Sequence, residues 1–172
     1  MDFSKQVTEL ISEQVTGWDL ASKNYEGLRK VKVKTFYLGN YHIDIQFNPE
    51  RIVSSAAKVD ARSIEARPCF LCQENLPPQQ RGLLLDDGYM VLVNPFPIFP
   101  KHLTIPNMLH TDQLILGNFE SMLDLASRLD EFIIFYNGPK CGASAPDHLH
   151  FQAGSKGFLP IEKDFSNERC CR

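Results

Sequence analysis

The sequence predicts an antiparallel α+β domain. Segments that alternate apolar and polar residues outnumber segments with helical spacing, and short connections join neighbouring segments. Seven of the eleven prolines lie between Pro68 and Pro106, which excludes a long helix from that stretch. We therefore expect a sheet of short antiparallel strands with a few helices packed against it.

The N-terminal part predicts a helix followed by a β-hairpin. Within residues 3–20 the apolar positions are spaced by three and four and form one amphipathic stripe: Phe3, Val7, Leu10, Ile11, Val15 and Trp18. Two segments then alternate apolar and polar side chains around a Gly39-Asn40 turn, residues 31–37 and 41–47. We interpret residues 1–48 as an extension of the same domain as residues 49–172.

The remaining chain predicts three strands, one helix and a final strand. After an irregular or weakly helical stretch at 48–67, short apolar segments indicate strands at residues 89–93, 102–105 and 132–136. Thr111 can cap a helix that runs to about Leu129, with an inner face of Leu114, Ile115, Phe119, Met122, Leu123, Ala126 and Leu129. Residues 137–146 form a Gly/Pro/Ser loop that leads into the last strand, residues 148–153.

Composition narrows the classes of partner. The chain has 172 residues, 43% of them hydrophobic, and a formal charge of -3, with no Lys/Arg run beyond residues 29–34. A nucleic-acid polymer requires a concentrated cationic face, so we expect none as a partner. No stretch approaches 18 apolar residues, and the N-terminus lacks the regions of a signal peptide. We therefore expect neither a membrane span nor secretion.

The cysteines indicate a reducing compartment and point to metal or redox chemistry. Their number is odd and they include two close pairs: Cys69, Cys72, Cys141, Cys170 and Cys171. A chain of this length and core content does not need a disulfide framework, so we expect a cytoplasmic protein. The Cys69-x-x-Cys72 spacing is typical of a metal knuckle, although a pair of inert buried thiols is the alternative.

The segment His148-Leu149-His150-Phe151-Gln152 carries the clearest chemistry. On a strand, alternation places the two histidines and Gln152 on one face, and Leu149 and Phe151 on the other. A neutral imidazole is a competent nucleophile at phosphorus, a nearby amide can donate to a phosphate oxygen, and the preceding Gly-rich loop can expose backbone N–H groups. The alternative is an ordinary strand with histidines on a solvated face.

This segment resembles the active-site motif of the histidine-triad superfamily in its His-x-His-x-Gln form. That form is found in the branch of galactose-1-phosphate uridylyltransferase, diadenosine tetraphosphate phosphorylase and GDP-L-galactose phosphorylase. Residues 94–106, which end in His102-Leu103-Thr104-Ile105-Pro106, resemble the nucleotide-binding strand-loop-strand of the same superfamily. The resemblance covers about residues 67–154 and implies a histidine-triad-like antiparallel sheet with packed helices.

The resemblance also implies roles for individual residues. It makes His150 the nucleophile that becomes a covalent nucleotidyl-histidine. It assigns contacts with phosphate, ribose and base to the remaining positions: Gln152 and Ser144 at phosphate oxygens, Asn137 and Gly142 in the phosphate loop, Asn94 at the ribose, and Phe96 and Ile98 at the base. Asp147 departs from the usual pattern, because it stands between Pro146 and His148, and this changes the geometry expected around Ser144.

Glutamine at the third position favours transfer over hydrolysis. An amide cannot act as a general acid near neutral pH, so Gln152 suits leaving and attacking groups that are already stable anions. We expect a nucleotidyltransferase or nucleotide phosphorylase acting on a nucleoside di- or triphosphate, a dinucleoside polyphosphate or a nucleotide sugar. A triad hydrolase and an inactive nucleotide- or partner-binding module are the alternatives.

Two further expectations follow from the resemblance. Zinc-bearing members use a Cys-x-x-Cys pair, a histidine after the Ile-Pro strand and the first histidine of the motif, which implies a structural zinc on Cys69, Cys72, His110 and His148. His102 is the competing ligand. Because related transferases continue well past the equivalent of Gln152, we also expect either a homodimer that completes the site or a short member with impaired activity.

Overall fold

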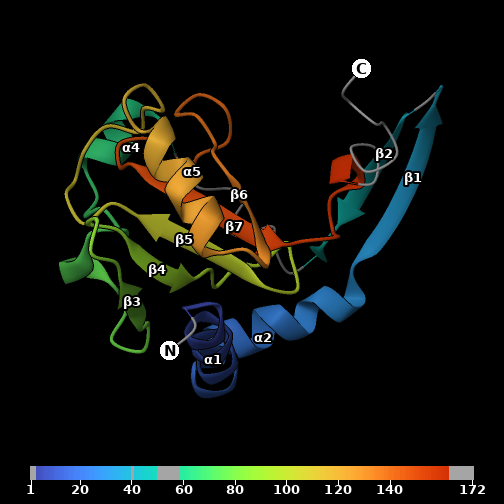
Figure 1. Cartoon of the computed structure of the whole chain (residues 1–172), viewed down its shortest axis with the longest axis horizontal. Coiled ribbons are helices and arrows are strands. Elements are labelled where there is room, and N and C mark those ends of the chain that lie inside the picture. Colours follow the sequence, from blue (N-terminus) through green and yellow to red (C-terminus); the bar gives the residue numbers. More distant parts are fainter. Residues whose placement is uncertain (1–2, 40, 50–58, 163–172) are drawn as a thin grey trace.

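The centre of the fold is a five-stranded antiparallel sheet. The structure is a computed structural model that describes residues 3–39, 41–49 and 59–162. The strand order is β3-β4-β5-β7-β6 (Figure 1), with bounds β3 (Gly82–Leu84), β4 (Met90–Val93), β5 (His102–Pro106), β6 (Phe132–Phe135) and β7 (His150–Ser155). The predicted α+β class is confirmed, and the short β3 is an addition to it.

Helices and turns surround this sheet. They are α1 (Phe3–Gly17), α2 (Asp19–Gly27), α4 (Ala61–Glu65) and α5 (Phe119–Arg128), with 3-10 turns η1 (Leu28–Lys30) and η3 (Gln73–Asn75). No helix in the described ranges has both the length and the hydropathy that crossing a bilayer requires. α4 lies in the stretch predicted as weakly helical, of which residues 50–58 lie outside the described residues.

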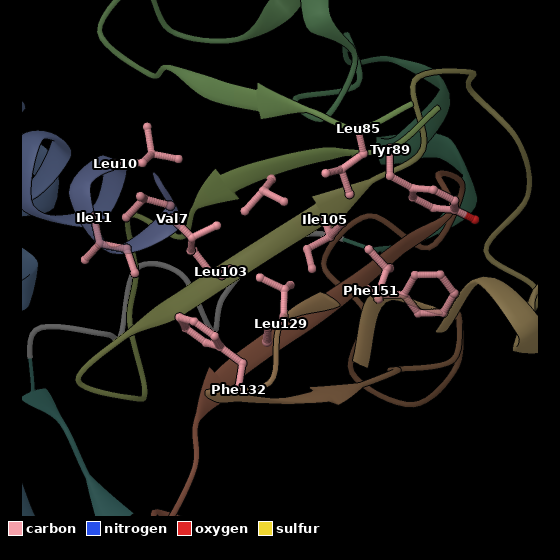
Figure 2. Packing of buried hydrophobic residues seen from close by; sticks show 14 of the residues in the cluster. Val7, Leu10, Ile11, Leu85, Tyr89, Leu103, Ile105, Leu129, Phe132 and Phe151 are labelled. Atoms are coloured by element: carbon pink, nitrogen blue, oxygen red, sulfur yellow. The ribbon is translucent and has the colours of Figure 1, made fainter. Parts of the chain in front are cut away.

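The two faces of the sheet have different environments. Leu103 and Ile105 of β5 and Phe151 of β7 belong to one buried cluster with residues from α1 and α5, many of which Figure 2 shows. Their neighbours along the strands, among them Thr104 and Gln152, line a pocket on the opposite face. Strand alternation therefore separates the hydrophobic core from the chemistry, as the sequence predicts for Leu149 and Phe151.

The single predicted N-terminal helix is in fact two helices. Trp18 adopts an extended conformation, with φ -123° and ψ 106°, and so ends α1 and begins a new direction for α2. α1 is fixed by Gln14, which donates to the Gln79 carbonyl at 3.0 Å and accepts from the Arg81 N–H at 2.9 Å. The prediction of one helix over residues 3–20 is wrong because the apolar spacing continues through a backbone break.

The predicted hairpin is present as β1 (Lys32–Leu38) and β2 (Tyr41–Phe47), and it projects away from the main sheet (Figure 1). Leu38 pairs with Tyr41, so the connection has two residues, of which Gly39 has a positive φ of 63° and Asn40 lies outside the described residues. The register places six exposed apolar side chains on one face: Phe36, Leu38, Tyr41, Ile43, Ile45 and Phe47.

The helix predicted from Thr111 begins later, at Phe119. Gly117 has a φ of 81°, which a right-handed helix does not allow, and the Thr111 carbonyl accepts a hydrogen bond from Leu149 N–H at 2.7 Å. Residues 111–118 therefore do not form a helix: Thr111 bonds to the segment that leads into β7, and Gly117 lies in a turn. The predicted inner face is wrong at four exposed positions, Leu114, Phe119, Leu123 and Ala126.

A glycine on β7 gives a test of packing on the pocket side of the sheet. A Cβ at Gly154 would lie 2.7 Å from atoms of the Phe99 ring, so we expect Gly154→Ala to destabilise the protein by about 1–3 kcal/mol through overpacking. Gly17→Ala is the matched control, because a Cβ there meets nothing within 4 Å. Urea unfolding measures both, and equal midpoints for the two variants would refute the packing argument.

Candidate functional site

One pocket of about 500 Å³ gathers all the residues that the sequence assigns to nucleotide and phosphate. They come from β7, from the start of the 94–101 connection and from the loop after β6: Asn94, Phe96, Ile98, Asn137, Gly142, Ser144, His150 and Gln152. Positions that are far apart in the chain thus share one cavity because β4, β5 and β7 are neighbours in the sheet.

His150 presents one ring nitrogen to this pocket. Its Nδ1 lies 2.8 Å from the His148 carbonyl oxygen, and because a carbonyl only accepts, Nδ1 carries the hydrogen. Nε2 therefore has the lone pair, and the described residues form no hydrogen bond with it. Burial lowers the pKa of His150, although the hydrogen bond to the His148 carbonyl acts in the opposite direction. The arrangement is that of a neutral imidazole with a free nucleophilic nitrogen.

The backbone of His150 is held by a side chain that the sequence analysis does not identify. Gln113, which is 1% exposed, accepts from His150 N–H at 2.7 Å and donates to the His150 carbonyl at 3.1 Å. The same amide nitrogen donates to the Asn137 carbonyl at 2.8 Å. Gln113 therefore joins the candidate nucleophile to the loop after β6. Its position in the predicted amphipathic helix gave no signal of this contact.

The strand prediction needs one correction at its start. β7 begins at His150, whereas residues 148–153 were expected to form the strand, because Leu149 bonds to the irregular segments around Thr111 and Asn107. His148 consequently does not share the pocket face with His150. Its ring lies with the cysteine knuckle instead.

The loop before β7 contains a glycine in the left-handed conformation at the edge of the pocket. Gly142 has a φ of 93°, a conformation that favours glycine, and it lines the pocket with the exposed Ser144. The Ser144 backbone carbonyl accepts a hydrogen bond from Arg67 Nη2 at 2.9 Å, and the serine hydroxyl takes no part in that bond. Asn94 is a turn residue as well as a pocket residue: its side chain donates to Thr104 Oγ1 and accepts from Phe96 N–H.

The apolar wall of the pocket is larger than the sequence predicts. Besides Phe96 and Ile98 it includes Trp18, at the break between α1 and α2, Leu20 of α2, and Phe70 and Leu71 from the Cys-x-x-Cys turn. The sequence predicts no pocket residue in the N-terminal helix. Its contribution to the pocket arises from a long-range approach that helical periodicity does not report.

The four predicted metal ligands lie together. The candidate ligand atoms of Cys69, Cys72, His110 and His148 are all within 4.8 Å of one another. Cys69 Sγ is 3.3 Å from His148 Nδ1, and Cys72 Sγ is 3.2 Å from His110 Nδ1. Two thiols and two imidazoles in such a cluster are a donor set that fits a tetrahedral zinc ion. His102 is not part of this cluster.

Both histidines of the cluster present the same nitrogen to it. His148 Nε2 lies 2.8 Å from the Asn107 carbonyl oxygen, and His110 Nε2 lies 3.5 Å from Asp147 Oδ2. The Asn107 carbonyl takes the Nε2 hydrogen of His148, so Nδ1 keeps its lone pair in that ring, and the Asp147 carboxylate favours the same tautomer in His110. Asp147, the residue that departs from the resembled pattern, thus contacts the cluster rather than the pocket.

The pKa shifts in the Cys/His cluster indicate a site that favours a positive charge. Burial opposes the charged forms, but the hydrogen bond between Cys69 and His148 lowers the pKa of the thiol and raises the pKa of the imidazole. Burial and the neighbouring Cys69 raise the pKa of Cys72 to about 11. Two adjacent thiolates are therefore unfavourable without a cation between them. Cys170 and Cys171 lie outside the described residues.

Comparisons with known proteins agree with this architecture. A family model described as "Domain of unknown function (DUF4922)" matches residues 10–155, and no curated protein matches significantly. Yeast Ap4A phosphorylase Apa2 in complex with AMP has a TM-score of 0.56 at 20% identity, covering 98% of this chain and 55% of its own. Its complex with Ap4A has a TM-score of 0.59 at 19% identity, covering 94% and 56%.

A histidine triad protein from Clostridium difficile also matches, with a TM-score of 0.38, 19% identity and coverage of 54% of this chain and 90% of its own. The chain spans about half the length of the yeast enzyme. The fold of this chain is similar to that of the yeast phosphorylase.

Gln113 bonds to both backbone groups of His150 and to the Asn137 carbonyl, and this set of hydrogen bonds, the Gln113 clamp, gives a stability prediction. Gln113→Leu keeps the volume but leaves the backbone groups of His150 and the Asn137 carbonyl without this partner. We expect a loss of about 3 kcal/mol in the free energy of unfolding. Gln79→Leu, at an exposed side chain, should change it by less than about 0.5 kcal/mol. Chemical denaturation compares the two, and an unchanged Gln113→Leu midpoint would contradict the clamp.

Proposed function

The chain belongs to the DUF4922 family, and from this premise we propose that it is a nucleotidyltransferase or nucleotide phosphorylase that works through a covalent nucleotidyl group on His150. One observation carries the proposal. His150 has its Nδ1 hydrogen bonded to the His148 carbonyl and its Nε2 free in a pocket lined by a glycine-rich loop. A neutral imidazole held in this tautomer is prepared to attack phosphorus.

The proposed reaction has two displacements at one phosphorus. His150 Nε2 attacks the α-phosphorus and forms a P–N bond, while the bond from phosphorus to the bridging oxygen breaks and that oxygen keeps the electron pair. An oxygen of inorganic phosphate or of a sugar phosphate then attacks the same phosphorus and releases the imidazole. The His148 carbonyl accepts from Nδ1–H throughout and so stabilises the charge on the substituted ring.

The third position of the motif supports transfer to an anionic acceptor. Gln152 lines the pocket and can donate to a non-bridging oxygen, but an amide cannot protonate a leaving group. The apolar wall around Trp18 and Phe70 offers a surface for a flat base. The yeast phosphorylase with a similar fold binds AMP and Ap4A, which supports a nucleoside polyphosphate or nucleotide sugar as the substrate class.

Zinc is the metal that we propose for the cysteine knuckle. It would be held by Cys69, Cys72, His110 and His148, with both histidines binding through Nδ1. A bound zinc would supply a fixed crosslink rather than reactive chemistry, since all four positions are taken by protein. Thiolate ligands of this kind suit the reducing cytoplasm. The homodimer stays a prediction, and the mass of the protein in solution checks it.

Covalent labelling tests the reaction. The protein is incubated with α-labelled nucleoside triphosphates and nucleotide sugars and run on a denaturing gel. We expect the wild type to retain acid-labile label, His150→Ala to lose it, and His42→Ala, on the distant hairpin, to keep it. Label that persists in His150→Ala would refute the assignment. No label with any nucleotide would favour a binding module.

Product analysis separates the enzyme classes. With inorganic phosphate present, a phosphorylase gives a nucleoside diphosphate and a hydrolase gives a monophosphate. We expect turnover to depend on added phosphate or sugar phosphate, because Gln152 lacks the acidity that a poor leaving group requires. Equal turnover without any added acceptor would favour the triad hydrolase.

Metal analysis tests the zinc site. We expect about one equivalent of zinc per purified chain, and less than about half an equivalent in Cys72→Ser. Cys141→Ser is the matched control, because Cys141 is exposed in the loop and lies outside the four-residue cluster. Thermal unfolding with a chelator should follow the same order. Wild-type protein without metal, or an equal loss in both variants, would contradict the site.

A further inference from the structure

A second buried histidine lines the pocket of the proposed nucleophile and is not needed for the displacement itself. His102 on β5 is 1% exposed, lines the same pocket and is absent from the metal cluster. Its ring packs edge-on against Phe99 and stacks on Phe135, with centroid distances of 5.2 and 6.2 Å. A ring enclosed in this way has a fixed orientation.

Two hydrogen bonds determine which nitrogen of His102 carries the hydrogen. The Ile98 N–H donates to His102 Nδ1 at 3.2 Å, and a backbone N–H can only donate, so Nδ1 accepts. In a neutral ring Nε2 then bears the hydrogen, and it lies 3.0 Å from Gln152 Oε1. The direction of both hydrogen bonds is therefore set by the backbone of the 94–101 connection.

This chain of bonds also determines the orientation of Gln152. Its Oε1 must face His102, because only the carbonyl oxygen of the amide accepts. Its Nε2, which has two hydrogens to donate, is then the amide atom left for the pocket, and no protein partner for it occurs in the described part of the chain. The reverse orientation would place two donors against each other.

We infer that His102 is a positioning residue, which holds the Gln152 amide so that Nε2 donates to a phosphate oxygen of the nucleotide. This inference rests on the proposed function for its catalytic consequence, but the hydrogen-bond chain itself is independent of it. A Gln152 amide held in this way favours a ligand group that accepts hydrogen bonds and never donates them, as a fully ionised phosphate does.

Two substitutions at His102 separate positioning from simple support of the loop. In His102→Gln the amide nitrogen can take the place of Nε2 and donate to Gln152, while the bond from Ile98 is lost. In His102→Asn the side-chain oxygen can accept from Ile98 N–H, while the bond to Gln152 is lost. Positioning predicts that His102→Gln labels His150 faster than His102→Asn. Loop support alone predicts the opposite order.

A double-mutant cycle makes the test quantitative. We expect His102→Asn to slow the labelling of His150 by about 10–100-fold in the wild-type background. In the Gln152→Met background the same substitution should have almost no effect, because the amide it orients is gone. An equal effect in both backgrounds, or faster labelling by His102→Asn than by His102→Gln, would overturn the inference. Thermal unfolding of each variant verifies folding.

Nuclear magnetic resonance distinguishes failure of this inference from failure of the proposed function. In wild-type protein labelled with ¹⁵N, we expect the His102 ring to show a protonated Nε2, and added AMP to shift the Gln152 side-chain amide signals. In His102→Asn that shift should shrink. If no nucleotide labels the wild type, the proposed reaction fails and these spectra still decide the positioning. A protonated Nδ1 would refute it, and so would Gln152 amide signals that stay unshifted while signals of other pocket residues respond to bound AMP.

Discussion

The alternation of side chains along β7 is the constraint on which the rest of the site depends. Leu149, Phe151 and Ala153 are buried in the core cluster, so the residues between them must face the other side of the sheet. A register shift of one residue would bury the polar set and expose the core set. The hydrophobic core therefore fixes the position of His150 and Gln152, although neither contributes much to it.

The cysteine knuckle and the pocket share structural elements. Phe70 and Leu71 lie between the two cysteines and form part of the apolar wall, while His148 directly precedes the segment that presents His150. An ion bound there would therefore order a wall of the pocket as well as the start of β7. Its effect on nucleotide binding would be indirect, through the positions of these side chains.

Local sequence patterns predicted those parts of the protein that depend on local spacing. Alternation identified the hairpin and the two faces of β7, and the motif residues do share one pocket. The parts that were missed depend on long-range contacts. Gln113 looks like one more polar residue of a helix, yet its amide bonds to a strand 37 positions away. Trp18 fits a helical stripe, yet its backbone is extended. Neither the hydrogen bond of Gln113 nor the backbone break at Trp18 leaves a periodic signal in the sequence.

The Gln113 clamp has a consequence for the architecture of the sheet edge. β6 covers β7 only from Gln152 onward, so His150 would otherwise expose a free N–H and C=O to strand addition. The glutamine side chain, with one acceptor and one donor, substitutes for a single residue of a missing strand. On the other side His150 lies opposite Pro106 without a ladder hydrogen bond to it, because both backbone polar groups of His150 point toward Gln113. One side chain thus closes the edge that β6 leaves open beside His150.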